Sequence, residues 1–281
     1  MSKTSRLEVT KVSELHLEPS YVVSKAQKIP VAIELMRRYN VDRVVVVSDS
    51  KVVGVVTLKD IFSKLSSKRM GGVSPTSLSV AAFASPNVIT TQLEESAQEA
   101  AQKMLEHNVS ALPVVGDGGV VIGLVTKLLL IPLMSKSNLC CREFASPSYL
   151  TISPRSKLSV ALEKLSKTPV RDLIVVEADR PLGVIGEREA AFTLFNLLRI
   201  DQIRHFDTFI KRLLVVDAMR RLTVALSGEE SLREAARLMR SSGANTLPLV
   251  KEDRVFGVVN RDNIFERLLR LEGEGKEVGY R

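Results

Sequence analysis

A seven-residue pattern that occurs four times constrains the fold of this chain more than any other feature. Residues 54–60 read GVVTLKD, and related stretches stand at 123–129 (GLVTKLL), 183–189 (GVIGERE) and 257–263 (GVVNRDN). The glycines that open them are 69, 60 and 74 residues apart. The stretch FASPNVIT at 83–90 also returns as FASPSYLT at 144–151. Self-similarity at this spacing predicts a chain of tandem structural repeats.

Each repeat predicts the same order of elements, β-α-β-β-α. A short strand is followed by a helix with apolar residues at helical spacing, as in 97–105 and 232–239. A nearly continuous apolar strand then turns back into the strand that holds the motif glycine, and a last helix begins at the polar residues of the motif. The expected first strands are Tyr21–Ser24, Val88–Thr91, Tyr149–Ile152 and Leu222–Leu226. The expected turns are Asp49–Ser50, Gly116–Gly119, Ala178–Asp179 and Glu252–Asp253.

The fold class is therefore mixed α/β (α+β), with four units expected at 8–68, 75–136, 137–200 and 205–272. A unit of about 60 residues buries too little apolar surface to be secure alone, so each should pair with a sister unit. The apolar residues Leu128, Leu129, Ile131 and Leu133, and the stretch Phe192–Leu198, should lie between units or between pairs. We expect the four units to close into a disc within one chain, which could also form a homodimer.

The unit, its LPVV strand and its closing pattern G-h-h-[ST]-x-x-[DN] resemble the CBS (cystathionine-β-synthase) domain over about residues 8–272. Four tandem copies resemble the gamma subunit of the AMP-activated kinase and the stand-alone CBS proteins of archaea and bacteria. The resemblance implies two Bateman modules of paired units, 1–136 and 137–281. It also implies clefts that bind adenosine-containing ligands such as AMP, ADP, ATP or S-adenosylmethionine.

The residue types of the motif suit such a ligand. A carboxylate at a helix start can accept charge-assisted hydrogen bonds from both hydroxyls of a ribose, and the N–H groups that open the helix favour anionic oxygen. Thr57 and Asp60 fulfil the pattern completely. The alternative for Asp60 is that of an ordinary helix cap.

The other three copies depart from this pattern at the polar positions. The fourth has Asn260 and Asn263, the third has Gly186 and Glu189, and the second keeps Thr126 but has Leu129 in place of the carboxylate. We therefore expect the first copy to be the most competent, followed by the fourth and the third. The second should be empty or repurposed.

The resemblance also implies which residues complete each cleft from the sister unit. Around Asp60 it implies Arg43, Val55, Lys59, Ile89, Val109 and Ser110. Around Asn263 it implies Tyr149, Val170, Arg171 and Val258. Phosphate groups need cations, and Lys127, Arg188 and Arg261 flank the other motifs and are further candidates.

Composition and the lack of catalytic motifs restrict the classes of function that this chain can have. The net charge of +8, from 40 basic and 32 acidic residues, suits anionic partners from nucleotides to nucleic acid. Nucleic acid is a secondary reading, because the chain has no tryptophan, 5% aromatics and no helix-turn-helix or zinc-finger spacing. His16, His107 and His205 lack metal-ligand spacing, and no Walker or other catalytic motif occurs. We therefore expect no enzyme activity, no metal and no catalytic cofactor.

The sequence predicts a cytoplasmic protein. The apolar run Val120–Met134 contains Lys127 and is shorter than a bilayer span, and the N-terminus has no secretory h-region. The adjacent Cys140 and Cys141 should be free thiols in a reducing cytosol. The expected function is that of a regulator that binds adenine nucleotides and signals to an unknown protein partner by a conformational change. The alternatives are a structural interaction scaffold with vestigial clefts and a protein that binds S-adenosylmethionine or nucleic acid.

Overall fold

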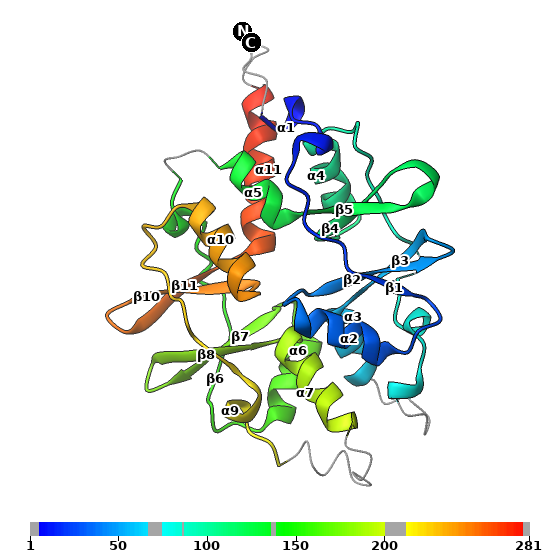
Figure 1. Ribbon diagram of the computed structural model, residues 1–281. Helices are drawn as coiled ribbons and strands as arrows, with labels where there is room; N and C mark the ends of the chain where they lie inside the picture. Colours follow the sequence, from blue (N-terminus) through cyan, green and yellow to red (C-terminus); the bar gives the residue numbers. More distant parts are fainter. Residues whose placement is uncertain (1–5, 67–74, 86, 136–138, 200–211, 278–281) are drawn as a thin grey trace.

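The computed structural model describes residues 6–66, 75–85, 87–135, 139–199 and 212–277. It contains four α/β units around a common centre (Figure 1). Unit 1 consists of β1 (Val22–Ser24), α2 (Ile29–Arg38), β2 (Arg43–Ser48), β3 (Lys51–Thr57) and α3 (Leu58–Ser66). Unit 2 consists of α4 (Ala97–Glu106), β4 (Ala111–Val115), β5 (Val121–Thr126) and α5 (Lys127–Met134).

The second half of the chain repeats this order. Unit 3 consists of β6 (Thr151–Ile152), α6 (Leu158–Lys167), β7 (Asp172–Glu177), β8 (Arg180–Gly186) and α7 (Glu187–Arg199). Unit 4 consists of α10 (Leu232–Ser242), β10 (Thr246–Lys251), β11 (Arg254–Asn260) and α11 (Arg261–Glu277). Short elements precede units 1 and 4, namely α1 (Arg6–Val9), α9 (Val215–Ala218) and β9 (Arg220–Arg221). The predicted fold class is confirmed.

The predicted hairpins are present in all four units, where β2–β3, β4–β5, β7–β8 and β10–β11 pair antiparallel. Three of their turns hold two successive residues at positive φ, the pattern of a type I′ turn: Asp49–Ser50, Ala178–Asp179 and Glu252–Asp253. The remaining turn uses Gly118 and Gly119 for the same purpose, at φ 71° and 80°. The turns therefore form where the sequence predicts them.

The prediction of a first strand is wrong for units 2 and 4, where only one residue of each expected strand forms a β-bridge. Thr91 and Leu226 form isolated parallel bridges to Val114 and Leu249. In units 1 and 3 the backbone N–H groups of Val45 and Ile174 donate to Tyr21 and Leu150 and hold the first strand. The corresponding residues in units 2 and 4 are Pro113 and Pro248. Because proline has no N–H, that hydrogen bond is lost and the strand shrinks to one bridge.

The segment that leads into each unit packs on the sister unit and not on its own. Lys11 and Glu18, which precede unit 1, pair with Ser96 and Leu124 of unit 2. Ser79, which precedes unit 2, pairs with Lys28 of unit 1. The second half repeats the exchange: Cys140 and Ser146 pair with unit 4, and Leu214 and β9 pair with unit 3. Sister units therefore share their backbone pairing in both directions.

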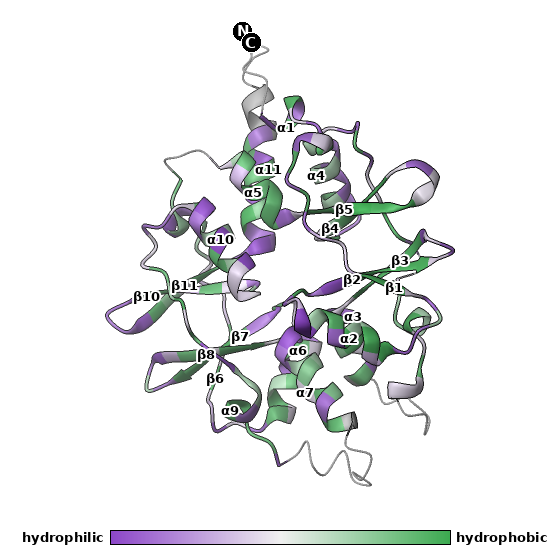
Figure 2. Cartoon of the chain, viewed as in Figure 1, coloured by the Kyte–Doolittle hydropathy of each residue, from purple (hydrophilic) through white to green (hydrophobic). Residues whose placement is uncertain are grey.

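Two large apolar cores join the halves of the chain. One combines residues of units 1 and 3 and includes Phe62 of α3 and Phe195 of α7. The other combines units 2 and 4 and includes Leu130 of α5 and Phe265 of α11. As expected, Leu128, Leu129, Ile131 and Leu133 pack in this second core, and Leu194, Phe195 and Leu197 are buried in α7. Figure 2 shows α5 as almost wholly hydrophobic, whereas hydrophilic residues gather where β2 and β7 begin, near the centre.

Candidate functional site

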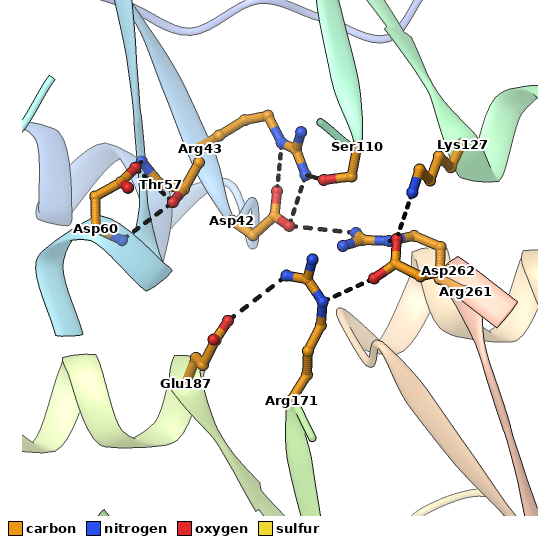
Figure 3. Close-up of polar contacts among 10 residues, drawn as sticks. All are labelled: Asp42, Arg43, Thr57, Asp60, Ser110, Lys127, Arg171, Glu187, Arg261 and Asp262. Atoms are coloured by element: carbon orange, nitrogen blue, oxygen red, sulfur yellow. Dashed lines mark hydrogen bonds and ion pairs between the residues drawn. The ribbon is translucent and has the colours of Figure 1, made fainter. Parts of the chain in front are cut away.

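The motif of unit 1 forms a closed hydrogen-bond pair between the end of β3 and the first turn of α3. The backbone N–H and Oγ1 of Thr57 both donate to Oδ2 of Asp60, at 2.8 and 2.6 Å, and the N–H of Asp60 donates to Oγ1 of Thr57 at 3.2 Å (Figure 3). Asp60 therefore caps the helix through Oδ2. Oδ1 receives no hydrogen bond from the described residues, so half of the carboxylate remains available.

A cavity of about 250 Å³ lies against this motif. Eight of the residues expected around it line this single cavity: Arg43, Val55, Thr57, Lys59, Asp60, Ile89, Val109 and Ser110. They come from both units of the first module, in agreement with the expected contribution of a sister unit. We refer to this space as the first cavity.

The other half of the chain supplies a wall of the first cavity, which the motifs did not predict at this place. Its residues are Arg171, Glu187, Arg188, Gly243 and Asn245, to which unit 1 adds Asp42. The sequence placed Arg171 at the fourth motif, but the structure also brings it to the first. Arg188 is a candidate cation of the third motif, but no local pattern assigns these residues to the first cavity, because contact between the modules places them there.

Asp42 and Arg43 begin the ionic network at the centre of the molecule (Figure 3). Arg43 donates from Nε and Nη2 to the two carboxylate oxygens of Asp42, at 2.7 and 2.8 Å, and from Nη2 to Oγ of Ser110 at 3.0 Å. Arg261 donates from Nη1 to Oδ2 of Asp42 at 3.4 Å. Burial by itself would raise the pKa of Asp42, but Arg43 and Arg261 hold it well below its usual range.

Asp262 links the remaining units to the same network. It accepts from Nζ of Lys127 at 2.8 Å and pairs with Nε of Arg171 at 2.7 Å, while Arg171 also faces Glu187 at 3.6 Å (Figure 3). Burial opposes ionisation of Asp262, yet Arg261, Arg171 and Lys127 lower its pKa to about 2. All four units therefore meet through charged groups. The side chain of Lys127 is only 2% exposed and forms an ion pair with Asp262.

The fourth motif differs from the first. Asn260 accepts from the backbone N–H of Asn263 at 2.7 Å, so the pair caps α11. Tyr149 and Val258 lie together, as expected, but in a small apolar cluster, and the Tyr149 hydroxyl donates to the carbonyl of Val255. Val170 packs against the core of units 1 and 3. Of the residues expected around Asn263, only Tyr149 and Val258 therefore lie together, while Val170 packs in another core and Arg171 reaches the central ionic network.

In the third motif, Glu189 is buried and already paired. It accepts from the N–H of Gly186 at 3.0 Å and from Nε of Arg220 at 3.0 Å, and Arg220 also donates to the carbonyl of Ser242 at 2.7 Å. The space beside Arg220 measures about 10 Å³. Glu189 is therefore a member of an internal ion pair.

Asp172 lies beside Glu189 and predicts a dependence of stability on pH. Burial, with the nearby charge of Glu189, raises its pKa from 3.8 to about 6. Because the folded state binds this proton more tightly, the contribution of Asp172 to the free energy of unfolding should be complete below pH 3.8 and be lost as the pH rises through 6. We expect Asp172→Asn to remove up to roughly 3 kcal/mol of this loss, stabilising the protein at pH 8 but not at pH 3.5.

Urea denaturation at the two pH values checks this expectation. The control is Asp117→Asn, which alters an exposed carboxylate in a hairpin loop and should not change the difference between the two pH values. Equal effects of Asp172→Asn at both pH values would contradict the assignment.

Other candidate chemistry finds no support in the described residues. They contain no group of three or more histidine, cysteine, aspartate or glutamate side chains that could hold a metal ion, and His205 lies outside them. Cys140 and Cys141 are free, and burial raises the pKa of Cys141 to about 12, which makes it a poor nucleophile. Among the described helices, none combines the length and apolar character needed to cross a membrane.

Comparison with known proteins agrees with this architecture. The uncharacterized protein MJ1225 of Methanocaldococcus jannaschii is 25% identical over 247 residues, which are 79% of this chain and 85% of that protein. The crystal structure of MJ1225, described as a proposed archaeal homolog of g-AMPK, matches with a TM-score of 0.74 at 22% identity and covers 90% of this chain and 97% of that one. This match shows a common fold.

A homoserine O-acetyltransferase of Methanococcus vannielii matches only in part. It is 31% identical over 101 residues, which are 36% of this chain and 20% of that enzyme. The model of the CBS domain matches this chain four times, at residues 12–67, 80–131, 141–195 and 209–270. With four copies that together span most of its length, this chain belongs to the CBS domain family.

Proposed function

We propose that this chain is a sensor that binds an adenine nucleotide in the first cavity and passes the signal on by a change in the arrangement of its modules. CBS domains are in general regulatory and not catalytic units. The observation that carries the proposal is the convergence of Asp60, Arg43, Lys59 and Ile89 on one cavity of about 250 Å³. These residues supply a ribose acceptor, phosphate donors and an apolar wall for the base.

The ribose would bind at Asp60. Its Oδ2 is occupied by Thr57, which holds the carboxylate in place, and Oδ1 can accept from ribose hydroxyls. A charge-assisted bond of this kind is stronger than one to water. Ile89 and Val109, from unit 2, would enclose the base between apolar side chains.

The charge of the lining favours a phosphate over a sulfonium. Four cations line the first cavity (Arg43, Lys59, Arg171 and Arg188) against three carboxylates (Asp42, Asp60 and Glu187), which leaves a net charge of 4 − 3 = +1. A phosphate gains from this balance, whereas the sulfonium of S-adenosylmethionine meets like charge. We therefore propose AMP, ADP or ATP as the ligand class.

Signalling would follow from the wall that the other module provides. Arg171, Glu187 and Arg188 line the first cavity from unit 3. A nucleotide held there contacts both modules, so it binds one of their arrangements more tightly and shifts the population towards it. A protein partner that binds the same arrangement would sense the nucleotide.

Calorimetric titration of the full chain with adenosine, AMP, ADP, ATP and S-adenosylmethionine tests the ligand class. We expect AMP to bind about 10-fold or more tightly than adenosine, because each charge-assisted hydrogen bond to phosphate contributes about 1.5–3 kcal/mol. S-adenosylmethionine should bind more weakly than AMP. Equal affinity for adenosine and AMP would exclude phosphate recognition, and a lack of binding to all five compounds would favour a scaffold with vestigial clefts.

A further inference from the structure

The second motif also lies against a cavity. This space, which we call the second cavity, measures about 260 Å³ and lies between Thr126 at the end of β5, the leading segment at Glu18–Tyr21, the end of α10 and Arg261. It shares Asp42, Arg43, Arg188, Gly243 and Asn245 with the first cavity. The sequence predicts that it is empty or repurposed, because Leu129 replaces the carboxylate of the motif.

Glu18 supplies the carboxylate that the motif lacks. Oγ1 of Thr126 donates to Oε1 of Glu18 at 2.9 Å, just as Oγ1 of Thr57 donates to Oδ2 of Asp60 at 2.6 Å. In both motifs the hydroxyl oxygen also accepts from the backbone N–H three residues later, at 3.1 and 3.2 Å. The same motif hydroxyl therefore holds a carboxylate in each case.

The backbone fixes Glu18 in this place. Its N–H and C=O both pair with Leu124 of β5, at 2.9 and 2.8 Å. The preceding motif glycine, Gly123, permits this close approach, because a Cβ there would lie 2.8 Å from Cβ of Leu17 and 3.2 Å from the carbonyl oxygen of Glu18. The carboxylate is thus carried by the exchanged leading segment.

The residue in the position of Glu18 differs among the four units. This position pairs with the residue that follows the motif glycine, and it holds Ser85 at the first motif, Glu18 at the second, Arg220 at the third and Ser146 at the fourth. Serine stands opposite Asp60 and Asn263, and arginine stands opposite Glu189 and neutralises it. A carboxylate stands at this position only opposite Leu129, where the motif has none. The last residue of the motif and the residue in the position of Glu18 together therefore set the charge of each cleft.

Arginines surround the second cavity. Arg43, Arg188, Arg240 and Arg261 line it against Glu18 and Asp42, so its net charge is 4 − 2 = +2, compared with +1 for the first cavity. Arg261 is 5% exposed, and its buried Nε has no hydrogen-bond partner among the described residues. A buried donor without a partner is costly, and an anionic oxygen in the cavity would satisfy it.

An aromatic surface completes the second cavity. The rings of Tyr21 and Tyr39 stack with their centroids 4.1 Å apart and an interplanar angle of 20°, and both residues line the cavity. Paired flat rings offer a base a surface on which to stack.

We propose that the second cavity binds a nucleoside phosphate and that Glu18 takes over from the missing motif carboxylate as the acceptor for the ribose hydroxyls. Arg240 pairs with Oε1 of Glu18 at 3.4 Å, so the ribose hydroxyls are assigned to Oε2. The other arginines hold the phosphates, and the tyrosine pair contacts the base. This site is independent of Asp60. Its greater positive charge favours a ligand with more phosphate charge than the first cavity requires.

The test uses ATP as the probe in calorimetry and the full chain carrying Asp60→Ala, which should weaken binding at the first cavity by about 10- to 100-fold and leave the second cavity unaltered. We expect this variant to keep one binding event. Adding Glu18→Gln, which keeps the shape and an acceptor for Thr126, should weaken that event at least 10-fold. Adding Glu14→Gln, an exposed change in the same leading segment, should leave it unaltered.

A ligand comparison gives the same answer without altering Glu18. In the Asp60→Ala protein, 2′,3′-dideoxy-ATP should bind at least 10-fold more weakly than ATP, because it lacks both hydroxyls. Loss of all ATP binding with Asp60→Ala alone, or equal affinity for the two nucleotides, would overturn the proposal. If the wild-type protein shows a single binding site and Asp60→Ala abolishes it, the proposed function of the first cavity stands and the proposal of a second site is wrong.

Discussion

Replacing Asp60 with alanine should weaken the binding of adenine nucleotide at the first cavity by about 10- to 100-fold. The carboxylate is expected to accept two ribose hydroxyls, and the loss of such charge-assisted bonds costs roughly 1.5–3 kcal/mol after water recovers part of it. The variant should also lose about 1 kcal/mol of stability, because Asp60 caps α3 through Thr57. Calorimetry of Asp60→Ala and Asp60→Asn, with thermal melting of both, measures the two effects separately.

The capping pair of α4 offers a matched control. Ser96 and Glu99 form the same reciprocal hydrogen bonds as Thr57 and Asp60, at a helix whose residues do not line the first cavity. Glu99→Ala should lower the melting temperature slightly and leave nucleotide affinity unchanged. Leu129→Ala should also destabilise the protein without affecting the first cavity, since Leu129 packs against the core of units 2 and 4. If Asp60→Ala binds like the wild type, Asp60 is only a helix cap.

Removing the carboxylate of Asp262 should destabilise the protein by about 3–5 kcal/mol, the usual cost of breaking a buried ion pair from one side. Asp262→Ala leaves Lys127 without its carboxylate partner and deprives Arg171 and Arg261 of a counter-charge. Restoring an apolar fit with the double variant Asp262→Ala, Lys127→Met should recover part of the loss, because the Lys127 ammonium lies 5.1 Å from the Phe265 ring in an apolar setting. Urea denaturation measures both variants.

An exposed ion pair provides the contrast, and pH provides a second readout. Glu163→Ala breaks the exposed pair with Lys167 and should change stability little. The pKa of Asp262 is lowered from 3.8 to about 2, so its contribution is complete above pH 3.8 and is lost as the pH falls towards 2. Asp262→Ala should therefore destabilise strongly at pH 7 and much less at pH 2. A loss equal at both values would show that packing, not charge, stabilises this position.

The sequence predicts the parts of the site that are local in the chain. Thr57 and Asp60 are three residues apart, and the hydrogen bonds that join them depend only on a strand that runs into a helix. The turns follow for the same reason, because they depend on a few adjacent residues. The shortened first strands of units 2 and 4 were also visible in principle, since Pro113 and Pro248 each remove a necessary donor.

The residues that the sequence did not reveal reach the site through contacts across the fold. Asp42 lies outside every motif, whereas Glu187 and Arg188 belong to the third motif, and module packing brings all three to the first cavity. Glu18 did leave a signal. Glu18-Pro19 stands where two of the other copies of this stretch read Ser85-Pro86 and Ser146-Pro147, and the remaining copy reads Arg220-Arg221. Its meaning depended on knowing that the leading segment crosses to the sister unit, which no periodicity of the sequence indicates.

The crossing of the leading segments has a consequence for how such a chain is made and how it can evolve. Unit 1 lacks the backbone partner of Lys28 until Ser79 has left the ribosome. Lys11 likewise has no partner until Ser96 has been synthesised, and Glu18 has none until Leu124 of β5 has been synthesised. Neither unit of a module can therefore close while the other is missing. Duplication of one unit alone would leave an unmatched leading segment, whereas duplication of a pair yields two complete bodies. A pair of units is thus the smallest segment whose duplication gives a complete folded body.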